Sequence, residues 1–339
     1  MNEREAMKEI VLVDVYYSHG GHNKVYADTI MTGIDSFEAC LAQTSKEIPI
    51  LHKRTDIIKI IIYNIKYLLK IFFNRNKHIH FLFLDSFIKY IWLMYPLLVI
   101  LKKSRGLTIT GTYHVFNKNK FMNPIMGLFD AIVVHSDFEP KDLKKKSKII
   151  KINYPSFLSI KADKRCHPER IRFGFLGGNR KEKRFDLFIE AINKTQHDIE
   201  VVIGGANTDL SSNGLQLNKK SKIISRFLTD EELKELIQYI DVLILPYDSS
   251  FKGQSGPLIE AAYAGKIIIS SDAQVMKQTV IRYNLGEIFE SGNSKDLVEK
   301  IDKVILNFDS YYPNKEFWKD YDKSKFIADY ADFFKQYQT

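Results

Sequence analysis

The residues best suited to chemistry lie in segment 241–272, DVLILPYDSSFKGQSGPLIEAAYAGKIIISSD. An apolar strand is followed there by a loop rich in Gly and Ser, and Pro257 indicates a helix start because proline favours the first helical position. Ser255 or Gly256 can cap this helix, and the backbone N–H groups from Ser255 to Leu258 have no partner inside it. Together with the positive end of the helix dipole, they predict a site for a phosphate group.

A carboxylate and a basic loop accompany this predicted site. Glu260 lies about one turn into the helix, where it could accept hydrogen bonds from two ribose hydroxyls; the alternative is a glutamate stabilised by the helix dipole. Earlier in the chain, the sequence RFGFLGGNRKEKRFDLFIEAI begins with a strand that leads into Gly177, Gly178, Arg180 and Lys183. Cations at the carboxyl end of a strand can neutralise a pyrophosphate without a metal, whereas the alternative is a solvated basic loop.

The segment around Glu260 resembles the donor site of GT-B glycosyltransferases, especially the family-4 type of retaining enzymes that use nucleotide-sugar donors. That family carries an E-x7-E motif, then a helix of small residues, a Gly and a strand, and this chain has SGPLIEAAYAGKIIISSD. Glu260 matches the second glutamate, which the resemblance assigns to the nucleotide ribose. Lys252 replaces the first glutamate, which the family places near the donor sugar, and loop groups around Gly253 could take over through backbone contacts.

The basic loop resembles the family's G-R…K-G segment, which supplies cations to the donor pyrophosphate. Counting from Gly177, the lysine falls six residues on at Lys183, as in the family pattern. Gly178 stands where the family has an arginine, and Arg180 or Arg184 could substitute for it. The resemblance therefore assigns Lys183, helped by Arg180, to the pyrophosphate.

The first half of the chain resembles the family's acceptor domain in layout. Gly20 and Gly21 follow the first expected strand, where the family has a Gly-Gly turn that lets the backbone approach donor and acceptor. His114 follows a later strand, where the family often has an active-site histidine; the alternative is a structural histidine. The resemblance implies that these three residues line the reaction centre.

Short β-rich runs alternate with longer amphipathic segments, which predicts βα units and parallel sheets. With the resemblance, this indicates an α/β chain of GT-B architecture, with two Rossmann-like parallel-sheet domains facing a central cleft. We expect an acceptor domain in 1–155, a donor domain in 168–305 and a linker in the polar segment 154–170. The C-terminal helix, 311–339, either packs back on the first domain or stays within the second. Strands are expected at 10–16, 79–84, 107–112, 131–135, 171–176, 199–204, 222–224, 242–246 and 267–270.

The excess positive charge lies in one half of the chain. The 339 residues hold 50 Lys+Arg and 41 Asp+Glu, a net charge of +9, and residues 1–160 account for all of it with 23 basic and 14 acidic residues. Segment 56–77 combines a wide apolar arc with three lysines on one helical stripe. It predicts either a surface resting on an anionic membrane or a helix packed on a sheet. The uncharged segment 90–101 is too short to span a bilayer, and we expect a buried core helix there.

Several other classes of protein are disfavoured. Cys40 and Cys166 are too few for a disulfide framework or a cysteine-type zinc site, and they favour a reducing compartment. The polar N-terminus lacks the pattern of a signal peptide. The chain has no dinucleotide, P-loop, zincin or serine-hydrolase motif, and we expect no metal site. Its basic balance would suit nucleic acid, but no recognised binding motif accompanies it.

The resemblance implies a hexosyltransferase with a nucleotide-sugar donor, most simply UDP- or GDP-linked, and a saccharide or lipid-linked acceptor in cell-surface glycan synthesis. It also implies retention of anomeric configuration, with no divalent metal and no cofactor. The charge favours a cytoplasmic protein, peripheral on the inner face of the cell membrane, that binds anionic lipid rather than nucleic acid. One alternative is a non-catalytic GT-B partner subunit or scaffold, motivated by Lys252 and the missing arginine. Another is a sugar-nucleotide epimerase on the same fold.

Overall fold

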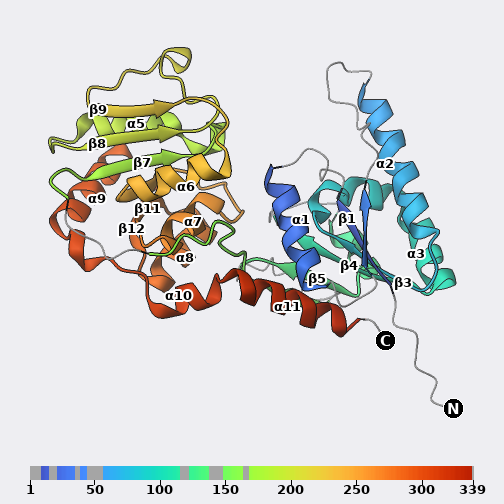
Figure 1. The fold of residues 1–339 in the computed structure, drawn as a ribbon. Helices are drawn as coiled ribbons and strands as arrows, with labels where there is room; N and C mark the ends of the chain where they lie inside the picture. The colour runs from blue at the N-terminus through green and yellow to red at the C-terminus, as the bar shows by residue number, and fades with distance from the viewer. Residues whose placement is uncertain are drawn as a thin grey trace. The chain divides into compact units, whose positions relative to one another are not determined.

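A computed structural model describes residues 9–14, 21–34, 39–43, 56–114, 122–136, 148–162 and 168–337. The chain divides into two compact units, each described here by itself (Figure 1). The first consists of Met1–Asn153 with Ser324–Thr339, and the second of Tyr154–Lys323.

The first unit contains a six-stranded parallel sheet in the order β2-β1-β3-β4-β5-β6. Its strands are β1 (Glu9–Asp14), β2 (Ala39–Gln43), β3 (Lys77–Phe81), β4 (Thr108–Tyr113), β5 (Ala131–Val134) and β6 (Lys148–Lys151). Its helices are α1 (Gly21–Gly33), α2 (Asp56–Phe72), α3 (Ile88–Arg105), α4 (Met122–Ile125) and α11 (Lys323–Lys335). The short 3-10 turns η2 (Leu84–Ser86) and η3 (Met126–Leu128) complete the unit.

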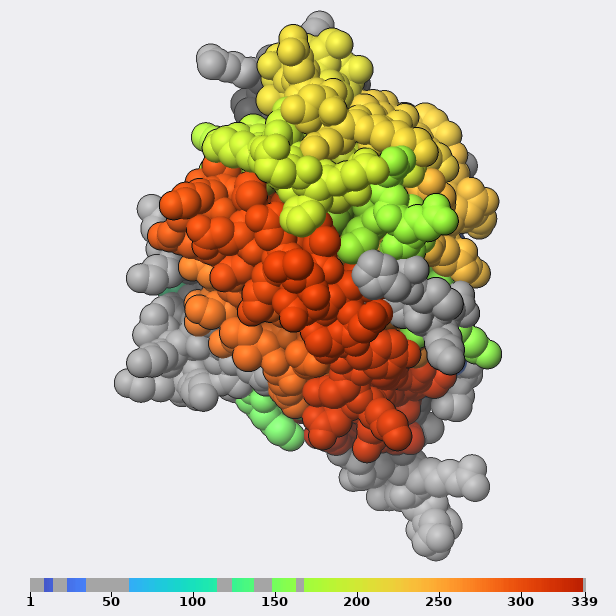
Figure 2. Space-filling model, turned by 90° about the vertical axis from the view of Figure 1, so that its left-hand side faces the viewer, coloured from blue at the N-terminus to red at the C-terminus, as the bar shows by residue number. Residues whose placement is uncertain are grey.

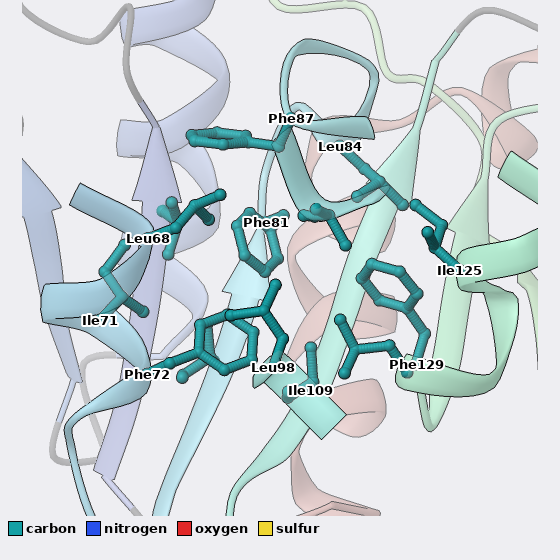
Figure 3. Close-up of a cluster of buried hydrophobic side chains, with 14 of the residues drawn as sticks. Leu68, Ile71, Phe72, Phe81, Leu84, Phe87, Leu98, Ile109, Ile125 and Phe129 are labelled. Atoms are coloured by element: carbon teal, nitrogen blue, oxygen red, sulfur yellow. The ribbon is translucent and has the colours of Figure 1, made fainter. Parts of the chain in front are cut away.

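The core of the first unit lies between one face of this sheet and the inner sides of α2 and α3. Phe72 from α2, Phe81 from β3 and Leu98 from α3 meet there, fully buried (Figure 3). The other face of the sheet carries polar side chains, and α11 packs against it. The ring of His80 on β3 lies 5.1 Å from the ring of Phe334 on α11. Both ring nitrogens of His80 contact threonine hydroxyls of β4, at 2.8 and 3.1 Å. Burial therefore lowers the pKa of His80 well below its ordinary value without leaving its nitrogens unsatisfied.

The second unit contains another six-stranded parallel sheet, in the order β12-β11-β10-β7-β8-β9. Its strands are β7 (Arg172–Leu176), β8 (Glu200–Gly204), β9 (Lys220–Ile224), β10 (Val242–Leu245), β11 (Ile267–Ser271) and β12 (Gly286–Phe289). Its helices are α5 (Phe185–Lys194), α6 (Asp230–Tyr239), α7 (Gly256–Tyr263), α8 (Gln274–Tyr283), α9 (Ser294–Leu306) and α10 (Lys315–Asp320). The 3-10 turn η5 (Lys181–Lys183) connects β7 to α5.

Helices cover both faces of the second sheet. The apolar sides of α5 and α9 pack on one face in a continuous core, while α6, α7 and α8 pack against strands β8, β10, β11 and β12. Figure 2 shows α9 and α10 in orange-red across one side of this unit. The central strands are therefore buried on both faces, as expected for a parallel sheet in an α/β protein.

The expected strands form, but three further strands were not predicted: β2, β6 and β12. The expected linker begins where the second unit begins, at Tyr154, and its Ser156 is fully buried. One other expectation needs correction. The expected core helix 90–101 is α3, and it is buried on one side only: Leu93 and Ile100 are 59% and 63% exposed. No helix among the described residues is long and apolar enough to cross a membrane.

Candidate functional site

The carboxyl ends of β7 and β8 meet through three glycines, Gly177, Gly204 and Gly205. The Gly177 N–H donates to the carbonyl of Gly204 at 2.7 Å. A side chain at Gly205 would place its Cβ 2.3 Å from the Gly177 carbonyl, and the φ of Gly205 is +146°. Only glycine allows this approach and this backbone conformation. The contact holds the loop that follows β7, which contains Gly178 and leads to η5, against the loop that follows β8.

Lys183 ends η5 and points back to this glycine. A Cβ on Gly177 would lie 2.7 Å from the Lys183 Nζ and 3.7 Å from Cγ of Pro257 in α7. The side chain is buried at 7% exposure, and its ammonium lies 5.5 Å from the ring centroid of Tyr247, an attractive cation–π geometry. Within the described residues, this ammonium has no ion pair and no hydrogen bond to a protein group. A buried cation without a counter-charge is an unfavourable arrangement unless an anion completes it.

The N-terminus of α7 lies beside this ammonium, as the contact with Pro257 shows. Ser255 is the N-cap, and its Oγ accepts a hydrogen bond from the Leu258 N–H at 3.4 Å. Its hydroxyl also lies 3.5 Å from the Tyr247 hydroxyl. Gly256 has open space where a side chain would stand, so the backbone can be approached there. The structure therefore brings together the basic loop and the helix start that the sequence predicted separately.

Glu260 is buried at 6% exposure on α7. Its carboxylate accepts hydrogen bonds from the Ser156 Oγ at 2.6 Å, from the Phe157 N–H at 2.7 Å and, bifurcated, from the Leu158 N–H at 3.3 and 3.4 Å. Burial raises the pKa of Glu260 to about 7, against the effect of these hydrogen bonds. A carboxylate offers about four lone-pair positions. The three donors use all four, but the bifurcated bond from Leu158 is long, and a further hydroxyl could replace one half of it.

The other basic residues of the two loops lie outside this cluster. The Arg180 side chain is 63% exposed and pairs with Glu182 at 3.0 Å. Arg184 pairs with Asp186 through both Nε and an Nη atom. Lys252, the residue in place of the first motif glutamate, donates to the carbonyl of Ser249 at 3.2 Å and is not buried. Lys183 is therefore the predicted cation that faces Gly177 and α7.

Two aromatic residues near the strand ends were missed by sequence reasoning. Tyr247 follows β10, and it contacts the Lys183 ammonium through its ring and the Ser255 hydroxyl through its own hydroxyl. Phe227 follows β9 and is 87% exposed. The available signal was their place just beyond an apolar strand, where ligand-binding side chains gather in parallel α/β sheets. A cavity of about 840 Å³ opens beside the basic loop, and its lining includes Asn179, Lys181, Arg184, Asn213 and Asp248.

The first unit places His114 at the end of β4, half-buried. Its Nε2 donates to the carbonyl of Leu82 at 2.9 Å, and its ring stacks on Phe83 with centroids 4.6 Å apart. The edge of the Tyr26 ring faces it at 5.1 Å. Gly21 begins α1, whereas Gly20 lies outside the described residues. His114 is thus held by contacts that would also suit a structural histidine.

A short polar chain runs beneath this histidine. The Nδ1 of His135 lies 2.7 Å from the carbonyl of Ile152, so it must donate. In the neutral ring Nε2 then accepts from the Tyr26 hydroxyl, 3.0 Å away. Tyr26 in turn lies 2.6 Å from the hydroxyl of Tyr330 on α11. These bonds fix Tyr26, and through it the position of the His114 ring.

No group of acidic, histidine and cysteine side chains in the described ranges could hold a metal ion.

Residues 158–316 match the family model described as Glycosyl transferases group 1. Among curated proteins, no sequence matches the chain. Solved structures with the same fold include sucrose-phosphate synthase from Thermosynechococcus elongatus, at 13% identity and a TM-score of 0.73, covering 97% of this chain and 99% of that one. The lipopolysaccharide outer core galactosyltransferase WaaB matches at 14% identity and a TM-score of 0.69, covering 97% of this chain and all of its own.

Anabaena HepE in complex with UDP and glucose matches at 11% identity and a TM-score of 0.64, covering 97% of this chain and 100% of that chain. Because these identities are low, the likeness establishes the fold alone. The chain has the GT-B fold, and its residues 158–316 match the glycosyl transferases group 1 family.

Proposed function

We propose that this protein is a glycosyltransferase that binds a nucleotide-sugar donor in its second unit. The observation that carries the proposal is Lys183, a buried residue whose ammonium has no counter-charge among the described groups and lies against Gly177, near the start of α7. A diphosphate is the anion that suits this position, because the positive end of the α7 dipole and the Gly256 N–H lie beside it. The domain match and the UDP found in Anabaena HepE support the same assignment.

The nucleoside is proposed to lie on the side of Glu260. Its carboxylate accepts two hydrogen bonds on each oxygen, and a ribose hydroxyl would replace one half of the long bifurcated bond from Leu158 while the bonds from Ser156 and Phe157 remain. The exposed ring of Phe227 offers a flat apolar surface on which a base could stack. UDP and GDP are the first donors to test.

In the reaction, the diphosphate leaves the sugar, and charge develops on its oxygens. Lys183 and the Gly256 N–H at the start of α7 would stabilise that charge with fixed groups, which is the electrostatic form of catalysis. We propose that the transferred group is a hexose, that its anomeric configuration is retained, and that no divalent metal takes part. The acceptor is proposed to be a saccharide or lipid-linked sugar held by the first unit, near Gly20, Gly21 and His114. We propose that such a transfer belongs to cell-surface glycan synthesis at the cytoplasmic face of the membrane.

Isothermal titration calorimetry with UDP, GDP, ADP and CMP tests the donor assignment. We expect one nucleoside diphosphate to bind, and CMP, which lacks a second phosphate, to bind far more weakly. Purified protein should then hydrolyse the matching nucleotide-sugar slowly, with release of that diphosphate. Absence of binding for every nucleotide would contradict the proposal.

A second candidate function is a non-catalytic subunit that keeps the fold. Lys252 favours it, because an exposed ammonium replaces the carboxylate that the family motif has near the donor sugar. Lys252→Glu separates the two functions: if the natural residue has removed turnover, the variant should gain hydrolysis of the donor. An active protein whose turnover falls in Lys252→Glu would instead support an enzyme adapted to lysine.

A further inference from the structure

Large apolar side chains form an outward-facing stripe on α3. Trp92, Leu93, Leu97 and Ile100 are 44%, 59%, 43% and 63% exposed. Their spacing places them on one side of the helix. The opposite side carries Ile91 and Leu98, which belong to the buried core, where Figure 3 labels Leu98. The stripe is therefore additional to the apolar side that the fold requires.

The neighbouring helix α2 continues this surface. Ile61 and Ile62 are 36% and 47% exposed on α2, and Phe73, just beyond its end, is 55% exposed. Helices α2 and α3 pack against each other, and the guanidinium of Arg105 on α3 lies 5.2 Å from the ring centroid of Phe73. We call these residues the α2–α3 face: Ile61, Ile62, Phe73, Trp92, Leu93, Leu97 and Ile100.

Positive charge surrounds the α2–α3 face. Residues 56–105 contain nine Lys+Arg and two Asp, and of the nine cations Lys77 and Lys102 pair with Glu9 and Asp130 outside the segment. Lys66 and Lys70 are exposed on α2, and Lys89 and Lys103 are exposed near the two ends of α3. The sequence of α3 contains no acidic residue. An exposed apolar surface with a basic border is complementary to a bilayer that contains anionic lipids.

We propose that the α2–α3 face docks the first unit on an anionic lipid bilayer. Trp92, Leu93 and Ile100 enter the boundary between headgroups and acyl chains, where tryptophan is favoured. The lysines bind lipid phosphates, and the helices lie along the surface, since neither is able to span it. This docking is independent of the nucleotide site proposed above.

A second copy of the chain is the competing occupant of this face. A two-fold dimer would bring the same surface of each copy together. The exposed lysines of the two copies, Lys66, Lys70, Lys89 and Lys103, would then repel each other. An anionic bilayer offers a negative charge for the lysines and an apolar layer for the exposed apolar side chains. The charge therefore selects the bilayer.

Vesicle flotation of the full chain tests the proposal. Wild-type protein should float with vesicles of phosphatidylcholine and phosphatidylglycerol, and much less with phosphatidylcholine alone. Leu93→Ser combined with Ile100→Ser should reduce the partition constant roughly tenfold or more, since two exposed apolar side chains leave the lipid. The matched control is Ile281→Ser with Leu306→Ser, two side chains of the second unit that are 63% and 77% exposed. It should float like wild type.

Charge and insertion are measured separately. Lys66→Glu with Lys70→Glu should reduce binding to the anionic vesicles, whereas Lys277→Glu, an exposed lysine on α8, should not. The chain has two tryptophans, Trp92 and Trp318. Vesicles with nitroxide-labelled acyl chains should quench the emission of wild-type protein, and Trp92→Phe should abolish this quenching.

Three results would overturn the proposal. The first is equal flotation of the wild-type protein and the Leu93/Ile100 variant, when circular dichroism shows that both are folded. The second is quenching that persists in Trp92→Phe, which would place another surface on the bilayer. The third is a wild-type dimer in sedimentation velocity that becomes monomeric in the Leu93/Ile100 variant, with no vesicle binding by either. That result would assign the face to a second copy.

Discussion

Replacing Lys183 with methionine should stabilise the protein without ligand and weaken its binding to nucleoside diphosphate. Methionine keeps the length and apolar body of the side chain and removes its charge. The residue is 7% exposed, and the favourable contact that the structure gives its ammonium is the Tyr247 ring at 5.5 Å. That contact contributes about 0.5–2 kcal/mol, whereas fully burying an ion costs several kcal/mol even after relaxation. Because the ammonium is not fully enclosed, only part of that cost applies, and the balance predicts a gain of up to about 1 kcal/mol in the free energy of unfolding.

The same substitution removes the cation that faces the diphosphate. A hydrogen bond between charged groups contributes about 1.5–3 kcal/mol, so affinity should fall roughly 10- to 100-fold. Calorimetry measures the affinity, and differential scanning calorimetry without ligand measures the stability. For a unit of this size, the gain corresponds to a rise in Tm of about 2–4 °C per kcal/mol. Lys181→Met, at an exposed position of the same turn, is the matched control and should change neither quantity appreciably.

A variant with lower Tm and unchanged affinity would refute the reasoning, since Lys183 would then be a structural residue. Lower Tm together with lower affinity would indicate damage to the loop rather than loss of charge. The prediction depends on opposite signs for the two measurements.

Three further changes test other parts of the structure. Because burial raises the pKa of Glu260 to about 7 from an ordinary 4.5, the free energy of unfolding should fall by up to about 3 kcal/mol as pH rises from 4.5 to 7, and Glu260→Gln should remove this slope in urea titrations. Nucleotide affinity should rise over the upper part of that range in wild type only, since ribose hydroxyls donate to the ionised carboxylate. Ser255→Ala removes the N-cap of α7 and should lower stability by about 0.5–1 kcal/mol in the same titrations, a small effect because its bond to Leu258 is 3.4 Å long; no change would show that the cap contributes nothing. Tyr330→Phe removes a hydroxyl 2.6 Å from that of Tyr26 and should destabilise the first unit by about 1–3 kcal/mol, seen as earlier urea unfolding; wild-type stability would mean that the polar chain is not needed.

The strands that sequence reasoning missed share one position in the fold. β2, β6 and β12 are all edge strands. A central strand of a parallel sheet is buried on both faces and appears as a continuous apolar run, as in VLIL of β10. An edge strand such as KIIK of β6 has a weaker pattern, with both lysines exposed. The fourth edge strand, β9, was nevertheless predicted at 222–224. A weak pattern therefore makes an edge strand easy to miss without excluding its prediction.

The donor-side cluster was predictable in part. The helix start at Pro257 and the position of Lys183 followed from local rules and motif spacing, and both occur in the structure. The partners of Glu260 did not follow, because Ser156 is 104 residues away in sequence. Contacts over that separation depend on tertiary packing, which no local pattern specifies. The role of Tyr247 was missed for the same reason.

Helix α3 shows a different limit of sequence reasoning. Its sequence, IKYIWLMYPLLVILKKSR, is apolar on every side, so periodicity cannot tell which side faces the core. The structure settles this by burying Ile91 and Leu98 and leaving Leu93 and Ile100 exposed. The expectation of a fully buried helix was wrong. α2 and α3 pack side by side on one face of the sheet, so only the side of α3 that faces the sheet is buried.

Both proposals rest on the same departure from ordinary burial. A folded chain usually places its charges in water and its large apolar side chains in the core, because either exception lowers stability. Here the second unit buries the Lys183 ammonium without a counter-charge among the described groups, and the first unit exposes Leu93 and Ile100 beside lysines. Each exception becomes favourable only when a complementary ligand is present: an anion in one case, and an anionic apolar layer in the other. The two ligands differ in charge density and size, so the two sites can be removed separately. A protein with Lys183→Met should still float with anionic vesicles, and one with Leu93→Ser and Ile100→Ser should still bind nucleotide.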